Sequence, residues 1–146
     1  MSDKKISQLT AKGTFLEDTD LFIISKSDGS GGYDTKYLTG AELRQIELNK
    51  EGTSYTLVLA DLNRLVEMEN GSANNLTIPP NSSVAFPVGS QILISQLGAG
   101  QTTVVPGSGV TLRSSGGKTK LSAQYAMGSL IKRGTDEWYL AGDITT

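Results

Sequence analysis

The sequence contains neither cysteine nor histidine among its 146 residues. The lack of cysteine excludes disulfide bonds and thiolate nucleophiles. The lack of histidine excludes Ser-His and Cys-His catalytic pairs, and the two absences together exclude the usual zinc sites. We therefore expect a protein that is not an enzyme and that holds no metal ion and no cofactor.

Charge is also scarce, because only 19% of the residues are Asp, Glu, Lys or Arg and the net charge is -2. A protein that binds nucleic acid through phosphate contacts needs a basic surface, so nucleic acid is not an expected partner. No apolar run approaches the roughly 20 residues that span a bilayer. No apolar run follows Lys4 and Lys5 as it would in a secretory signal. The expectation is a soluble protein made in a cytoplasm, with no membrane partner.

Proline and polar residues divide the chain into two regions. All four prolines follow residue 75, and the polar stretch 49–54 separates segments of different pattern. A hydrophobic fraction of 37% supports a folded core. We place the domain boundary there, which gives an N-terminal region of residues 1–49 and a C-terminal region of residues 50–146.

The N-terminal region predicts a β-hairpin followed by a short helix. Residues 20–26 and 33–38 have strand character, and the Gly-rich loop between them suits a turn. Thr39 and Glu42 match a capping box, which predicts a helix over residues 41–48. Such a unit buries little surface and needs a partner, so we interpret it as an attachment domain. Its candidate attachment residues are Leu21, Phe22, Ile23 and Ile24.

The C-terminal region reads as short strands punctuated by Gly and Pro, which makes the chain mainly β. This pattern predicts an antiparallel β-sandwich or β-barrel. No internal repeat of fixed period is evident. The predicted core consists of ten apolar positions: Leu57, Leu59, Ile92, Ile94, Val104, Val110, Leu112, Leu130, Ile131 and Leu140.

Few motifs suggest chemistry. Glu67 and Glu69 are two apart on a predicted strand and could form a carboxyl pair, although surface pairs of this kind are common. The acidic cluster 17–20 lacks the spacing of a calcium loop and is interpreted as a turn. Trp138 and Tyr139 lie on opposite faces of the last long strand, so one is expected in the core and the other is a candidate for stacking on a sugar.

The C-terminal region resembles a module appended to bacteriophage fibre and tail proteins. The resemblance covers most of residues 54–143. It rests on the runs 76–89, 91–94, 96–104, 109–112, 126–132 and 138–143. The N-terminal region is similar to short attachment segments of phage structural proteins through the runs 6–9, 20–25 and 38–43.

The resemblance implies a virion structural protein, usually a homotrimer, without catalytic residues and with an N-terminal part that docks on the particle. Its expected partners are its own copies and the major capsid protein or another virion protein. We expect a short head fibre or capsid decoration, because the chain lacks the shaft repeats of long tail fibres. The alternatives are a tail-fibre or tail-tip subunit and a module that binds a host surface polysaccharide.

Overall fold

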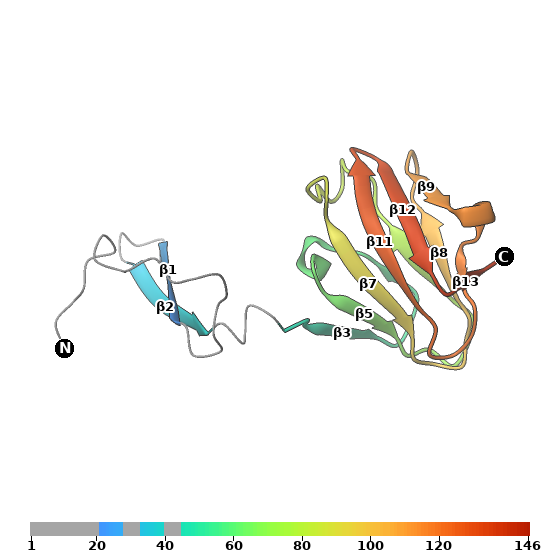
Figure 1. The fold of residues 1–146 in the computed structure, drawn as a ribbon, viewed down its shortest axis with the longest axis horizontal. Coiled ribbons are helices and arrows are strands. Elements are labelled where there is room, and N and C mark those ends of the chain that lie inside the picture. Colours follow the sequence, from blue (N-terminus) through green and yellow to red (C-terminus); the bar gives the residue numbers. More distant parts are fainter. Residues whose placement is uncertain (1–20, 28–32, 40–44) are drawn as a thin grey trace, which may run out of the picture. The chain divides into compact units, whose positions relative to one another are not determined.

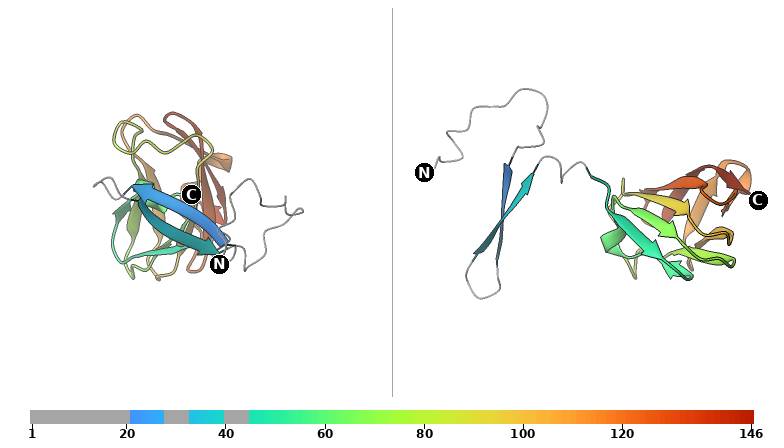
Figure 2. Two further views of the ribbon diagram at one scale, coloured as in Figure 1. Left: turned by 90° about the vertical axis from the view of Figure 1, so that its left-hand side faces the viewer. Right: turned by 90° about the horizontal axis from the view of Figure 1, so that it is seen from below.

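The computed structural model describes residues 21–27, 33–39 and 45–146. The chain divides into two units, Met1–Gln45 and Ile46–Thr146, so the division lies a few residues before the expected boundary at residues 49 and 50. In the first unit, β1 (Leu21–Ser27) and β2 (Tyr33–Thr39) pair antiparallel, which confirms the predicted hairpin (Figure 2).

Part of the predicted helix over residues 41–48 is wrong. Residues 45–47 have no regular structure, and Leu48 begins strand β3. Leu48 and Lys50 pair with β5 in the larger sheet of the second unit, and this tertiary pairing outweighs the local helical pattern. Residues 40–44, including the capping box, lie outside the described residues.

The second unit is mainly β and contains two sheets (Figure 1). The six-stranded sheet has the order β3 (Leu48–Glu51), β5 (Leu65–Met68), β7 (Gln91–Gln96), β11 (Met127–Gly134), β12 (Glu137–Gly142) and β9 (Thr111–Ser114). The five-stranded sheet has the order β13 (Ile144–Thr145), β10 (Lys120–Leu121), β8 (Thr102–Pro106), β6 (Asn74–Ile78) and β4 (Tyr55–Thr56). Two short 3-10 turns, η2 (Leu59–Asp61) and η3 (Ser115–Gly117), complete it.

Both sheets are mixed, so the predicted antiparallel arrangement is wrong. From β3 to β8 the chain alternates between the two sheets, and each strand pairs in parallel with the strand two steps earlier. Each connection carries the chain across to the other sheet instead of back along the same one. Parallel neighbours are the geometric result.

The turns of successive crossings stack on each other. Leu65 pairs with Leu93 and Asn74 pairs with Thr102, so the turn at residues 97–101 lies against the turn at residues 69–73. Gly98 N donates to Met68 O at 2.9 Å, and Gly100 N donates to Asn70 O at 3.0 Å. A Cβ atom at Gly98 or Gly100 would lie 2.2 or 2.1 Å from a backbone oxygen of the turn beneath. Glycine is therefore required at both positions.

One hydrophobic core takes residues from both sheets. Six of the ten predicted core residues are buried in it: Leu57, Ile92, Ile94, Val104, Leu130 and Leu140. Val110 and Leu112 pack against it while partly buried. The prediction is wrong for Leu59 and Ile131, which are 53% and 40% exposed. Leu59 lies in η2 instead of a strand, and Ile131 alternates with the buried Leu130 and Lys132 of β11.

Candidate functional site

The outward side of the six-stranded sheet carries an unusual number of apolar side chains. We call this surface the outer face and define it by Leu48, Leu65, Leu93, Met127, Ile131 and Tyr139. The strand register places Leu48, Leu65 and Leu93 side by side on three adjacent strands. It also places Ile131 beside Tyr139 on the next two strands. The outer face therefore extends over five strands, from β3 to β12.

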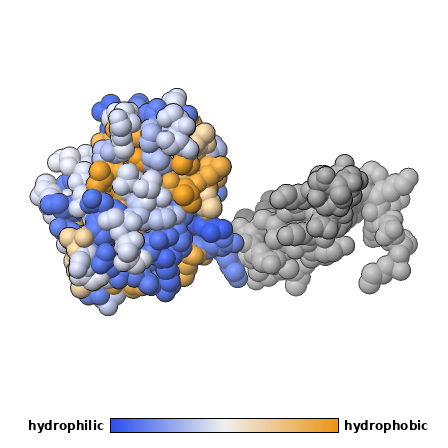
Figure 3. All heavy atoms as spheres, turned by 180° about the vertical axis from the view of Figure 1, so that it is seen from behind, coloured by the Kyte–Doolittle hydropathy of each residue, from blue (hydrophilic) through white to orange (hydrophobic). Residues whose placement is uncertain are grey.

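Several residues of the outer face are largely exposed to solvent. The exposed fractions are 56% for Leu48, 47% for Met127, 40% for Ile131 and 42% for Tyr139. Soluble proteins rarely leave apolar side chains gathered in one area unless that area contacts another molecule. Apolar residues also reach the surface elsewhere, and the side seen in Figure 3 mixes hydrophobic with hydrophilic residues. Val58, Leu59 and Val88 are exposed outside the sheet.

A shallow hollow on the outer face contains an unpaired polar group. The hollow measures about 210 Å³ and is lined by residues that include Leu65, Met127, Tyr125 and Ser95. The Ser95 hydroxyl is buried and has no hydrogen-bond partner within the described part of the chain. A buried hydroxyl without a partner costs folding free energy, and here it belongs to a residue at the edge of an apolar hollow.

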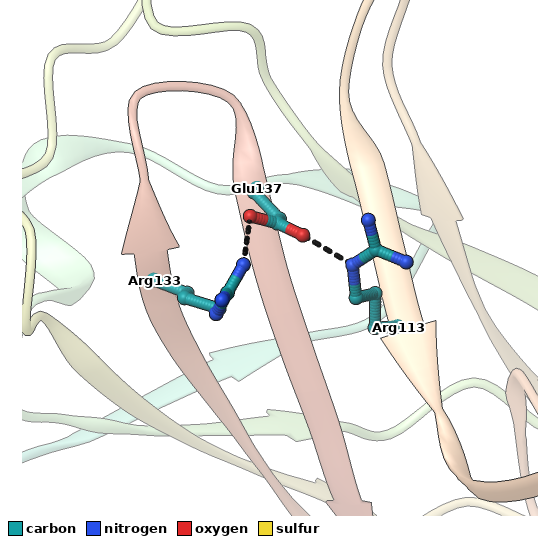
Figure 4. Close-up of polar contacts among 3 residues, drawn as sticks. All are labelled: Arg113, Arg133 and Glu137. Carbon is teal, nitrogen blue, oxygen red and sulfur yellow. Dashed lines mark hydrogen bonds and ion pairs between the residues drawn. The ribbon is translucent and has the colours of Figure 1, made fainter.

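A charged cluster borders the outer face at the end of β11 and β12. Glu137 accepts hydrogen bonds from Arg113 of β9 and from Arg133 of β11 (Figure 4). The two guanidinium groups hold the pKa of Glu137 below its ordinary value, and Arg113 has the larger effect. The Arg133 guanidinium lies 5.6 Å from the centroid of the Tyr139 ring, which is within the range of a cation–π contact.

The cluster adjoins a cleft that exposes Tyr139. The cleft measures about 400 Å³, and its lining includes Tyr139, Arg113, Ser114 and Ser115. An aromatic ring, a guanidinium group and hydroxyls are the groups that commonly contact sugar rings. The cleft is therefore suited to a small polar ligand as well as to a protein contact.

The two aromatic candidates for sugar stacking differ sharply in exposure. Trp138 is 1% exposed and packs edge-on against Phe86, with 5.5 Å between ring centroids, so the structure removes it from a surface role. Tyr139 is the exposed member of the pair, because adjacent residues of a strand face opposite sides. The candidate attachment residues Leu21, Phe22, Ile23 and Ile24 lie in β1, and their side chains are outside the described part of the structure.

The carboxylates singled out by their spacing are paired with a lysine. Lys50 Nζ lies 3.1 Å from a carboxylate oxygen of Glu69 and 3.9 Å from one of Glu67. Both carboxylates raise the pKa of Lys50, and Glu69 has the larger effect. This arrangement is an ion-pair network instead of an acid–base pair. Residues 17–20, the acidic cluster, lie outside the described residues.

Two classes of site are not found in the described ranges. Residues 21–27, 33–39 and 45–146 contain no group of three metal-binding side chains. The same ranges contain no helix with the length and hydropathy needed to cross a membrane.

The sequence analysis missed the outer face, although a signal for it was present. Along β11 the residues Met127, Ser129, Ile131 and Arg133 alternate with the buried positions. Two of these four outward residues are apolar, whereas a solvated sheet face normally carries polar ones. The unexpected apolar residues on the solvent side were the available clue.

Comparisons with known proteins identify no relative. No model of a protein family matches the chain, and no curated protein matches it significantly.

Proposed function

We propose that this chain is a non-enzymatic structural protein of a bacteriophage virion, a short homotrimeric head fibre or capsid decoration. The support is the resemblance of residues 54–143 to a phage fibre module and of parts of residues 6–43 to phage attachment segments. The division into the units Met1–Gln45 and Ile46–Thr146 suits a protein with one docking part and one outward part. In this proposal the first unit binds the major capsid protein or another virion protein.

We infer that the second unit is a β-sandwich and not a barrel. The strands β3, β9, β13 and β4 each end a sheet and have a neighbour on one side only. A closed barrel has no such ends. The core residues Met68 and Leu76, from different sheets, belong to one cluster, as in two layers packed face to face.

The observation that carries the trimer is the outer face. Met127, Ile131 and Tyr139 are 40% to 47% exposed, and the buried Ser95 hydroxyl lies unpaired in a hollow beside Met127. A second copy that covers this face removes its apolar side chains from water. Three copies arranged around one axis also shield the open ends of the sheets.

The trimer is tested by sedimentation equilibrium of the full chain at micromolar concentration. We expect a species of three 15.5 kDa chains. Ile131→Glu and Met127→Glu place a charge on the outer face and are expected to yield monomers. Val88→Glu is the matched control, because Val88 is 65% exposed and lies outside the sheets. A monomeric parent protein, or an Ile131→Glu variant that stays trimeric, contradicts the proposed interface.

The attachment role is tested on virus particles. A chain that lacks residues 1–45 keeps the whole second unit and is expected to fold but not to join particles. Incorporation of this variant at the occupancy of the full chain contradicts the assignment. Cryo-electron microscopy of intact particles then separates a head fibre from the alternative, a tail-fibre or tail-tip subunit.

A second candidate function, binding of host surface polysaccharide, is favoured by the cleft at Tyr139. Tyr139 is 42% exposed there beside Arg113, Ser114 and Ser115. This candidate requires that Tyr139 lies outside the contact between copies. Binding of purified host polysaccharide that is lost in Tyr139→Ala, with an unchanged sedimentation mass, supports this function. Equal adsorption of particles with and without the protein excludes it.

A further inference from the structure

Lys132 is an unusual residue because it is a buried lysine in the core of the unit. It lies on β11 with 1% of its surface exposed, and its Nζ atom lies near the Trp138 ring and the Phe86 backbone oxygen. Lysine is almost never fully buried unless it is paired. Its Nζ atom lies 5.9 Å from the centroid of the Trp138 ring, and Phe86 and Trp138 are themselves buried.

The contacts of Lys132 Nζ are amide oxygens and not carboxylates. Nζ donates to Asn81 Oδ1 at 2.6 Å and to Phe86 O at 2.8 Å. Asn81 is fixed in turn, because its backbone N–H donates to Asp136 Oδ1 at 2.6 Å. The amine of Lys132 and the carboxamide of Asn81 are therefore in direct contact and oriented by their neighbours.

The surroundings of Lys132 favour the neutral form of its amine. Burial lowers the pKa of Lys132, and the charge of Asp136 opposes this shift. A larger share of neutral amine results, and the neutral form has the lone pair needed for attack. The hydrogen bond from Nζ to Asn81 Oδ1 holds the amine beside the carboxamide, and fixed contact of this kind raises the effective concentration of the two groups.

We propose that Lys132 and Asn81 form an intramolecular isopeptide bond after the chain has folded. The Nζ lone pair forms a bond to Asn81 Cγ, and the bond from Cγ to Nδ2 breaks. One proton passes from Nζ to the departing nitrogen, which leaves as ammonia. The product is a secondary amide, with no oxidation, no reduction and no further reactant. Asp136 is a positioning residue that holds Asn81 against the amine.

The bond ties the segment between β6 and β7 to β11 of the six-stranded sheet. Residues 81 and 132 are 51 positions apart in sequence, so the bond closes a long loop. A covalent link of this length restricts the unfolded chain and stabilises the folded unit, as a disulfide does in proteins that contain cysteine. This inference is independent of the proposed function, because it concerns the core and not the outer face.

Intact-mass spectrometry of the purified full chain under denaturing conditions tests the proposal. We expect a mass lower than that of the sequence by one ammonia, about 17 Da. After proteolysis we expect one branched peptide that contains both Asn81 and Lys132. An intact mass equal to that of the sequence overturns the proposal and identifies Lys132 as a non-covalent clamp.

Single substitutions assign the bond to these two residues. Lys132→Met and Asn81→Ala are each expected to restore the full mass of their own sequences. Lys118→Met is the matched control, because Lys118 follows η3 and takes no part in these contacts, and this variant is expected to keep the loss of ammonia. Loss of ammonia that persists in Lys132→Met overturns the assignment. The intact mass of the parent protein, without any substitution, shows whether the bond forms even if a variant fails to fold.

Discussion

The two sheets are built from two stretches of chain that differ in how their strands pair. The stretches are residues 48–106 and residues 111–145. In the first stretch every strand pairing is parallel, because the chain crosses from one sheet to the other at each turn. In the second stretch β11 and β12 form an antiparallel hairpin, and β10 pairs antiparallel with β13. The hairpin depends on contacts between neighbours in sequence, whereas the parallel stretch depends on turns that stack on each other.

The largest loss of stability is expected at the stacked turns of the parallel stretch. Gly100→Ala places a Cβ atom 2.1 Å from the backbone oxygen of Ser72, and backbone atoms cannot move aside as a flexible side chain does. We expect the free energy of unfolding to fall by about 3 kcal/mol or more. Urea denaturation followed by circular dichroism measures the change.

The opposing turn supplies a control for this variant. A Cβ atom at Gly71 meets nothing within 4 Å, and the backbone there needs no left-handed conformation. Gly71→Ala is therefore expected to change the free energy of unfolding by no more than about 0.5 kcal/mol. Equal losses at positions 71 and 100 contradict the stacked arrangement.

The hairpin is tested by its two adjacent aromatic residues. Trp138 is 1% exposed, so Trp138→Ala leaves a large cavity and is expected to cost about 3 to 5 kcal/mol of stability. Tyr139→Ala removes an outward ring and is expected to cost less than about 1 kcal/mol. Both are measured at one protein concentration, because the proposed association through the outer face would add a concentration-dependent contribution. A larger loss at position 139 than at position 138 contradicts the assigned faces.

The positions of most strands could be predicted from sequence, and their partners could not. Runs such as Gln91–Gln96 and Glu137–Gly142 are apolar or alternating, so local pattern defines them. Whether the turn at Asn70 and Gly71 returns to the same sheet or crosses to the other depends on what the next strands pair with. A single strand and its turn contain no information about partners that lie 28 positions away, as Leu65 and Leu93 do.

Prediction of the site failed for a related reason. Alternation along β12 separates Trp138 from Tyr139 but does not say which of them faces the core. Ile131 was assigned to the core because it is apolar, yet its neighbours on the adjacent strands place it on the outer face with Tyr139. A surface that binds another molecule carries apolar residues on the outside. The rule that apolar residues lie inside therefore assigns such residues to the core.

A buried carboxylate joins the two sheets in the parallel stretch, and one of its hydrogen bonds makes the stability of this stretch depend on pH. Asp61 accepts hydrogen bonds from Asn49 Nδ2 at 2.9 Å, from the Tyr55 hydroxyl at 3.0 Å and from Val58 N at 2.8 Å. Burial of the phenol is the larger cause and the hydrogen bond to Asp61 the next one, and together they raise the pKa of Tyr55 to about 12. The folded state therefore binds the phenolic proton more tightly than the unfolded state does.

This contribution to stability is complete below the unfolded pKa of about 10 and is lost as the pH rises through the folded value. We expect the free energy of unfolding to fall by up to about 2 kcal/mol between about pH 10 and pH 12. Tyr55→Phe is expected to remove this pH dependence, and Tyr125→Phe, at a residue that is 71% exposed, is expected to retain it. A profile of Tyr55→Phe that matches the parent protein excludes the role of Tyr55.

The smallest effect is expected where the hairpin meets β9, the one parallel neighbour in the second stretch. Glu137 joins Arg113 of β9 to Arg133 of β11, and both arginines are more than half exposed. Because the arginines lower the pKa of Glu137, the ion pairs stabilise the fold above the unfolded pKa, and this contribution is lost as the pH falls through the folded value. Solvent and salt screen exposed pairs, so Glu137→Gln is expected to lower the midpoint of thermal unfolding slightly at low salt and not measurably at high salt. Differential scanning calorimetry at two salt concentrations measures this, with Glu51→Gln as a control on β3. A loss as large as that of Trp138→Ala contradicts this ranking and indicates that the edge strand, not the core, limits stability in the second stretch.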